Sequence, residues 1–176
     1  DDAAAATSFV SSFDADEVAA CDAATSITIS GSITSAVATK LLGDTTTPVT
    51  LATVTGDSSQ LSSLTLGSGD TIATLTTSDE ASVAEATLMH AKATTVTAYT
   101  LEDTAANLTA STTAAAVLNG ASAITASTAV TVSQSIAIDA ATGANDASTT
   151  FSIADTAANV LNATTAQLTR DANNDI

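Results

Sequence analysis

The side chains of this sequence that could do chemistry are almost all carboxylates. Of 19 acidic residues 15 are Asp, and only Lys40, Lys92 and Arg170 oppose them, so the 176-residue chain carries a net charge of −16. Two carboxylates at a suitable separation can act as acid and base in glycoside hydrolysis. The sequence argues against that chemistry, because the chain has one Tyr, three Phe and no Trp with which to build a sugar-binding platform.

Nucleophilic catalysis is restricted by the composition. His90 is the single histidine and Cys21 the single cysteine. Ser-His-Asp and Cys-His mechanisms need a histidine base, so one dyad of His90 with Cys21 or a serine is the most that the chain can form. His90 ends an amphipathic stretch, which favours a solvent-facing or capping role. We therefore expect no catalytic residue and no enzyme activity.

One segment resembles part of a calcium loop. Asp171, Asn173 and Asp175 place oxygen ligands at alternate positions, as in the first half of such a loop. Ile176 then stands where the loop needs Gly. These three residues are a weak calcium candidate, the alternative is a polar C-terminal end over 171–176, and no other cofactor is expected.

The acidic charge also limits the partners. Nucleic-acid binding depends on Lys and Arg that neutralise phosphates, and docking to anionic lipid needs basic residues too. No apolar run approaches the roughly 20 residues of a membrane span. We expect no nucleic-acid partner and no membrane insertion. Surface glycans stay open, on Ser and Thr or at the Asn-x-Thr triplets that begin at Asn107 and Asn162.

Two pairs of similar segments indicate internal repeats. Residues 99–108 and 151–160 share the run Asp-Thr-Ala-Ala-Asn at an offset of 52, and residues 75–86 resemble 124–135 at an offset of 49. Extended backwards, these pairs place strand starts at 27, 54, 75, 101, 124 and 153. The spacing predicts about six alternating modules of about 25 residues, a length typical of solenoids.

Each module is expected to begin with a short β-branched strand, as at 23–30, 94–101 and 149–153. Ala-rich helical segments follow Asp79, Asp103, Ser127 and Asp155, and Asn119-Gly120 is a helix stop. Residues 44–74 lack a helical period and predict strands and turns only. The predicted fold class is a repeat solenoid. Its N-terminal part is β-rich, and its C-terminal part has mixed β/α coils, each a strand plus a short helix.

The expected domain organisation has three parts. Residues 1–22 form an N-terminal arm or cap, residues 23–170 a single solenoid domain, and residues 171–176 a polar end. Ala, Thr and Ser number 40, 35 and 21, which suits thin stacked layers with room only for small side chains. Four repeated residues are assigned structural roles: Asp103 and Asp155 as helix N-caps, Asn107 and Asn159 as a stacked, buried ladder. Calcium ligation is the alternative for the two aspartates.

The segments at 99–108, 116–125 and 130–138 resemble the repeats of very large secreted surface proteins of cyanobacteria and proteobacteria. Those repeats run from a strand through Asp-Thr-Ala-Ala-Asn-Leu, an Ala-rich helix and Asn-Gly-Ala to an Ile-Thr strand. The resemblance covers about residues 75–170. It implies an extracellular adhesin, S-layer or matrix-type protein, often exported in one step and often calcium-dependent. The sequence lacks the Gly-Gly-x-Gly-x-Asp calcium repeat, so calcium dependence is not carried over.

The leading hypothesis is a secreted, non-enzymatic structural protein of the bacterial cell surface. It assembles with copies of itself into an extracellular filament, sheath or layer, because the open end of a solenoid recruits another chain. The alternative is a stalk segment of a large secreted adhesin, monomeric in isolation. A carbohydrate-active enzyme on a β-helix is a third reading, which the scarcity of aromatic residues disfavours.

Overall fold

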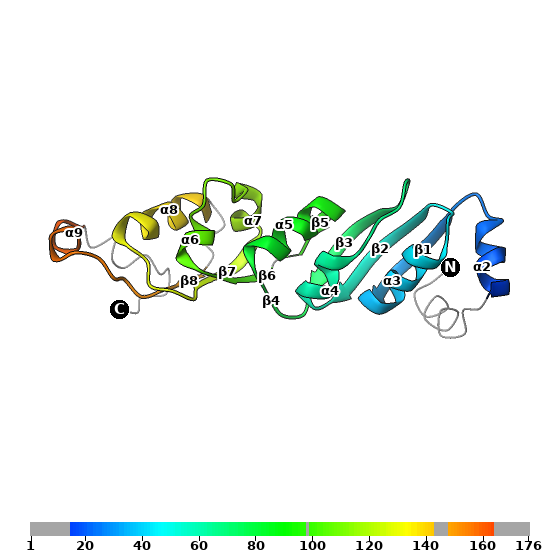
Figure 1. The fold of residues 1–176 in the computed structure, drawn as a ribbon, viewed down its shortest axis with the longest axis horizontal. Helices are drawn as coiled ribbons and strands as arrows, with labels where there is room; N and C mark the ends of the chain where they lie inside the picture. The colour runs from blue at the N-terminus through cyan, green and yellow to red at the C-terminus, as the bar shows by residue number, and fades with distance from the viewer. Residues whose placement is uncertain (1–14, 98, 143–147, 164–176) are drawn as a thin grey trace. The chain divides into compact units, whose positions relative to one another are not determined.

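The computed structural model describes residues 15–97, 99–142 and 148–163. The fold is mixed α/β, with two four-stranded parallel sheets among these residues (Figure 1). The chain divides into two compact units, which we call unit 1 (residues 1–79 and 88–97) and unit 2 (residues 80–87 and 98–176). The domain boundaries predicted at residues 22 and 170 are not tested by this division.

Unit 1 contains a sheet whose strands follow one another in chain order, β1-β2-β3-β5. The strands are β1 (Ile27–Thr34), β2 (Val49–Gly56), β3 (Thr71–Thr77) and β5 (Ala93–Val96). Three helices accompany them in the described part of unit 1: α2 (Ala15–Asp22), α3 (Ser35–Asp44) and α4 (Ser58–Ser63). We call one strand together with the segment that leads to the next strand of its sheet a rung.

The rungs of unit 1 repeat every 21 residues along one column of inward side chains. Ile33, Val54, Leu75 and Val96 pair across the four strands in that order. The first three are at most 2% exposed. A second column joins Ile29, Leu51 and Ile72, which are at most 5% exposed. The core is therefore a stack of identical positions, which explains how so few large apolar residues suffice.

Hydroxyl side chains form the matching outer columns. Ser32, Thr53, Thr74 and Thr95 pair in register on one side of the inward column, and Thr34, Thr55 and Thr76 on the other. Further along, Thr71 Oγ1 donates to Thr50 Oγ1 at 3.1 Å. Threonine suits these positions because a β-branched side chain packs well on a pleated surface and its hydroxyl can bond locally, as Thr55 Oγ1 does to the carbonyl of Ile33 at 3.3 Å.

Unit 2 has strands β4 (Glu80–Ala81), β6 (Tyr99–Asp103), β7 (Ala121–Ala126) and β8 (Ser148–Thr150), paired in that order. Its buried column consists of Ala81, Leu101, Ile124 and Thr149. The helices are α6 (Ala105–Leu108), α7 (Ala115–Asn119), α8 (Val132–Thr142) and α9 (Ala157–Asn162). Helix α5 (Val83–Lys92) begins in unit 2 and ends in unit 1.

Several predicted elements are confirmed. Helices follow Asp79, Asp103, Ser127 and Asp155, and α7 ends at Asn119 with Gly120 as its C-cap. The prediction of strands and turns only over 44–74 is wrong, since α4 lies there. Helix α4 buries Leu61 and is six residues long. A segment of that length is too short to show a helical period in the sequence. The repeat solenoid itself stays a prediction.

The predicted strand positions are only partly right. The start at 27 is correct, whereas the next strands of unit 1 begin at Val49 and Thr71, not at 54 and 75. The predicted strand 94–101 is in fact two strands, β5 and β6, which belong to different sheets. The alternating pattern runs through both strands, so it does not reveal where one sheet ends and the other begins.

Candidate functional site

Three carboxylates join neighbouring rungs at the beginnings of helices. Asp79 Oδ1 accepts the backbone N–H of Ser58, the first residue of α4, at 2.7 Å. Asp103 and Asp155 do the same for Val83 of α5 at 3.0 Å and Val132 of α8 at 3.1 Å. In each pair the carboxylate comes 20 to 23 residues after the amide. The first N–H groups of a helix lack partners within it and favour negative charge, so each bond stabilises a helix start.

A hydroxyl takes the same place at a fourth helix. Thr128 Oγ1 accepts the backbone N–H of Ala105, the first residue of α6, at 3.0 Å, and the two residues lie 23 apart. A neutral acceptor therefore does for α6 what carboxylates do for α4, α5 and α8. We call these four contacts the inter-rung caps.

The Asp-Thr-Ala-Ala-Asn run supplies a second set of bonds within its own rung. Asp103 Oδ1 accepts both the backbone N–H of Thr104 and the side-chain amide of Asn107, each at 2.7 Å. Thr104 Oγ1 accepts the backbone N–H of Asn107 at 3.2 Å and is the N-cap of α6. The carboxylate of Asp103 thus holds two donors of its own rung and one of the preceding rung.

The second copy of the run repeats these bonds. Asp155 Oδ1 accepts from Thr156 N at 2.7 Å and from Asn159 Nδ2 at 2.8 Å, and Thr156 is the N-cap of α9. The prediction that Asp103 and Asp155 are the N-caps is therefore wrong by one residue. Each aspartate instead caps the helix of the preceding rung.

The predicted asparagine ladder is also wrong. Asn107 and Asn159 are exposed, and each side-chain amide bonds to the aspartate four residues earlier. An aspartate within reach satisfies the amide locally, so these positions need no partner in another rung.

The other repeated pair of segments forms reciprocal caps. Ser82 and Glu85 exchange hydrogen bonds at the start of α5, and Thr131 and Gln134 do so at the start of α8. In each, the Glu or Gln side chain accepts the N–H of the first residue and the hydroxyl accepts the N–H of the second. This capping box is visible in the sequence as Ser/Thr-x-x-Glu/Gln.

Two further aspartates fasten the opposite ends of rungs in unit 1. Asp70 accepts from Val49 N at 2.8 Å and from Gly67 N at 2.7 Å. Asp22, the last residue of α2, accepts from the backbone and the hydroxyl of Thr46 at 2.7 and 3.0 Å. The C-terminal end of α2 is thereby attached to the loop before β2.

Hydrogen bonding lowers the pKa of several of these carboxyls. The side-chain amide of Asn159 and then the N–H of Thr156 hold the pKa of Asp155 below its usual range. Burial acts to raise the pKa of Asp79, but hydrogen bonds from Thr77 and Ser58 outweigh it, and the net direction is down. The N–H and hydroxyl of Thr46 lower the pKa of Asp22. These groups serve as acceptors in the ionised form.

The two residues considered for nucleophilic catalysis show no activation. Burial, and next the charge of Asp22, raise the pKa of the half-buried Cys21 thiol, which disfavours the reactive thiolate. His90 lies in the last turn of α5, and burial lowers its pKa, so its imidazole is neutral at pH 7.

The described residues allow only part of the metal and membrane predictions to be compared with the structure. Within the described ranges, no group of three or more His, Cys, Asp or Glu side chains is placed to hold a metal ion. Asp171, Asn173 and Asp175 lie outside the described residues, so the calcium candidate is not tested. Over that same part of the chain, no helix has the length and apolar character needed to cross a bilayer.

Two surface hollows occupy equivalent places in the repeat of unit 2. One of about 310 Å³ lies between α8 and α9 beside Val132 and Asn159. The other, of about 180 Å³, lies beside Val83 and Asn107. A hollow of about 390 Å³ in unit 1 lies beside Leu42 of α3 and Ser63 of α4. Their linings contain neither aromatic nor basic side chains, in contrast to most ligand sites.

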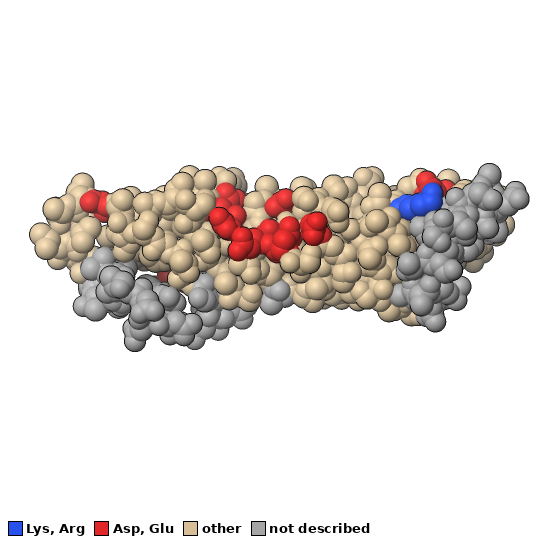
Figure 2. All heavy atoms as spheres, turned by 90° about the horizontal axis from the view of Figure 1, so that it is seen from below, with Lys and Arg blue, Asp and Glu red and all other residues tan. Residues whose placement is uncertain are grey.

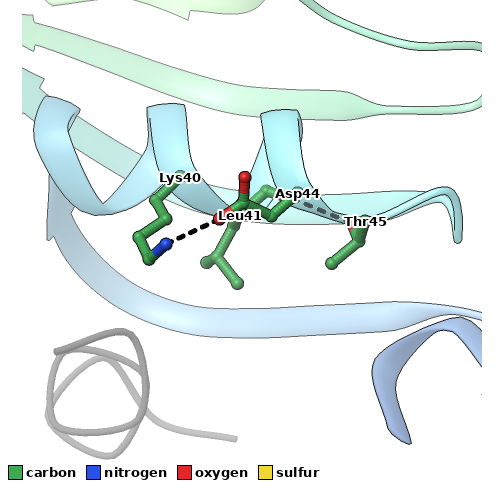
Figure 3. Close-up of polar contacts among 4 residues, drawn as sticks. All are labelled: Lys40, Leu41, Asp44 and Thr45. Atoms are coloured by element: carbon green, nitrogen blue, oxygen red, sulfur yellow. Dashed lines mark hydrogen bonds and ion pairs between the residues drawn. The ribbon is translucent and has the colours of Figure 1, made fainter. Parts of the chain in front are cut away.

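Basic groups are sparse on the surface. On the face shown in Figure 2, acidic side chains outnumber basic ones. Lys40 Nζ lies 2.7 Å from Asp44 Oδ2 one turn further along α3, and Thr45 Oγ1 donates to the carbonyl of Leu41 beside them (Figure 3). An exposed pair at this spacing contributes about 0.3–0.5 kcal/mol, so it is a local feature of α3 and not part of a binding site.

The sequence contains a short motif that marks the rungs of unit 1 and is less obvious than the longer repeats. A hydroxyl residue, an apolar residue and Thr recur one rung apart, at Ser32-Ile-Thr, Thr53-Val-Thr, Thr74-Leu-Thr and Thr95-Val-Thr. A search for short motifs at that spacing would have found both the inner column and its outer hydroxyls. The inter-rung caps have no comparable signal, because each depends on which rung lies beside it.

Comparison with known protein families, with curated proteins and with solved structures finds no match to this chain.

Proposed function

We propose that this chain is a non-enzymatic structural protein of the bacterial cell surface, secreted and built as a repeat solenoid. Its copies assemble outside the cell into a filament, sheath or layer. The inter-rung caps carry this proposal. The aspartates are the side chains most able to do chemistry, and in these caps they hold one rung to the next. Asp103, for example, has three donors on its two oxygens.

The sheet edges supply a means of assembly. Among the described residues β1 and β5 are the edge strands of one sheet, and β4 and β8 those of the other. An edge strand can recruit a further chain by backbone pairing. The net charge of −16 opposes unspecific lateral association, and divalent cations would relieve this repulsion outside the cell. The resemblance of the Asp-Thr-Ala-Ala-Asn repeats to secreted surface proteins supports the location.

The second candidate is a stalk segment of a large secreted adhesin. The observation that favours it is that the caps at Ser58, Val83 and Val132 each join one rung to the next. A chain fastened only between neighbours can serve as a spacer for a distant binding domain.

Negative-stain electron microscopy of the purified chain distinguishes the two. We expect long regular fibres or sheets with millimolar Ca²⁺, and their loss on chelation if the cation relieves the repulsion. Fibres in both conditions would support self-assembly without a cation. Dispersed particles in both conditions would contradict self-assembly and favour the stalk.

A further inference from the structure

The four inter-rung caps use two kinds of acceptor. Asp79, Asp103 and Asp155 cap α4, α5 and α8, whereas Thr128 caps α6. The helix position is the same in every case, namely the first residue. A carboxylate changes its hydrogen-bonding character on protonation, while a hydroxyl does not titrate in the range where proteins fold.

We propose that the inter-rung caps form an acid-sensitive latch. Protonation of Asp79 and Asp155 releases the first amides of α4 and α8, while Thr128 keeps its hold on α6. This inference rests on the geometry of the caps and not on the proposed function.

Protonation weakens the acceptor of each carboxylate cap, as the geometry at Asp155 illustrates. Asp155 accepts from Thr156 N and Asn159 Nδ2 on one oxygen and from Val132 N on the other. All three are N–H donors that cannot turn to accept, so a proton added to Oδ2 competes with the Val132 N–H for the lone pairs of that oxygen. The bond from Val132 N to Oδ2 is the longest of the three, at 3.1 Å, against 2.7 and 2.8 Å for the bonds to Oδ1.

The charged groups around the caps are mostly other carboxylates. Ser78 Oγ, next to Asp79, donates to Asp57 Oδ1 at 2.9 Å. Glu102 precedes Asp103 on β6, Glu85 lies in the first turn of α5, and Asp139 lies on α8. The basic residues of α5, His90 and Lys92, are in its last turn, at the far end from its cap.

Acid also relieves charge repulsion over the whole chain, whose net charge is −16 at pH 7. Global stability therefore mixes two opposing effects and cannot isolate the latch. Exchange of single amide hydrogens can, because each cap protects one identified N–H.

The direction of the pKa shifts sets the range of pH. The pKa values of Asp79 and Asp155 lie below the ordinary value of about 3.9. For a group whose folded pKa is lowered, the stabilisation is present above the unfolded pKa and is lost as pH falls through the folded one. The latch therefore opens below about pH 4.

Amide exchange followed by NMR at about pH 6 and about pH 2.5, corrected for the intrinsic rate at each pH, tests the latch. We expect protection of the Ser58 and Val132 amides to fall by about tenfold in acid, the effect of losing one bond to a charged acceptor. Protection of Ala105 should stay within about twofold. Equal loss at all three amides, or no loss at any, would overturn the latch.

A reciprocal exchange of the acceptors provides the matched control. Thr128→Asp should make the Ala105 amide acid-sensitive, and Asp155→Thr should make that of Val132 insensitive. Asp79→Thr tests the same point at Ser58 if the Asp155 variant does not fold, which far-UV circular dichroism reveals. Variants that fold but leave the pH dependence on the original amides would overturn the assignment.

Discussion

The carboxylate of Asp103 lies 3.0 Å from the backbone nitrogen of Val83, 20 residues earlier in the chain. The same carboxylate holds Thr104 N and Asn107 Nδ2 at the start of its own helix, α6. One side chain therefore orders two helix starts that belong to successive rungs. The energetic consequences of this arrangement can be measured residue by residue.

Replacing Asp103 should cost more than losing an ordinary surface charge. Asp103→Ala removes the acceptor for three N–H groups, and we expect the free energy of unfolding to fall by about 1–2 kcal/mol, the usual cost of losing a helix cap. Urea denaturation followed by circular dichroism measures the change. Asp44→Ala, which removes only the exposed pair with Lys40, is the control and should change stability by less than about 0.5 kcal/mol. Equal effects of the two variants would contradict the role given to Asp103.

The core column of unit 1 predicts a large effect at Leu75. This side chain is fully buried and pairs with Val54 and Val96 on the neighbouring strands. Leu75→Ala should lower the free energy of unfolding by about 2–5 kcal/mol through lost burial and the cavity left behind. Thr65→Ala, at an exposed position between α4 and β3, should stay within about 0.5 kcal/mol. A small effect at Leu75 would contradict the column, and chemical denaturation of both variants decides.

Tyr99 predicts a loss of stability in alkali. Its hydroxyl donates to the carbonyl of Val117, and burial raises the pKa of Tyr99 to about 12. In the unfolded chain a tyrosine titrates near pH 10, so the folded state binds the proton more tightly. Stability should therefore fall as pH rises from about 10 towards 12.

The variant Tyr99→Phe isolates this effect from the titration of lysines. It lacks the ionisable hydroxyl, so its melting temperature should change less between about pH 9 and pH 12 than that of the parent chain. At pH 7 the variant should be less stable by about 0.5–1.5 kcal/mol, because the Val117 carbonyl loses its donor. Parallel melting curves of the two proteins across the alkaline range would show that Tyr99 is not responsible.

Gly31 predicts a backbone effect. It has φ of +80°, a backbone conformation that residues other than glycine rarely adopt. It lies where β1 shifts register between Ile29 and Ser32. Gly31→Ala should destabilise unit 1 by about 1–2 kcal/mol through backbone strain. Gly43→Ala is the control, since its Cβ meets nothing within 4 Å and α3 gains a better helix former. Thermal melts that rank the two variants the other way would refute this account of Gly31.

The elements predicted correctly are those with local causes. Helix α6 follows Asp103 because a polar N-cap, an Ala-rich run and Leu108 at helical spacing are all close in the sequence. The wrong choice between Asp103 and Thr104 as N-cap has a non-local cause. Either side chain can cap α6, and Asp103 is turned towards Val83 because a neighbouring rung offers it a free N–H.

Elements whose bounds depend on strand pairing could not be predicted from the alternation of apolar and polar residues. The alternation over 94–101 continues from β5 into β6, and only the partners, β3 in one sheet and β4 with β7 in the other, separate them. The candidate site shows the same limit. The repeated aspartates were recognised as structural, yet the amides they hold lie 20 to 23 residues away and carry no sequence mark.

The constant rung of unit 1 also has a genetic consequence. An in-frame duplication of one whole rung keeps Ile33, Val54, Leu75 and Val96 in a single column, so the unit can lengthen or shorten by recombination between its own repeats without any new contact. A change of one residue is different, since it turns every following side chain to the other face of the sheet. Strand β1 records how such a change is absorbed: Ile29 and Ile33 are four residues apart where Leu51 and Val54 are three, and the extra residue sits in the bulge at Gly31.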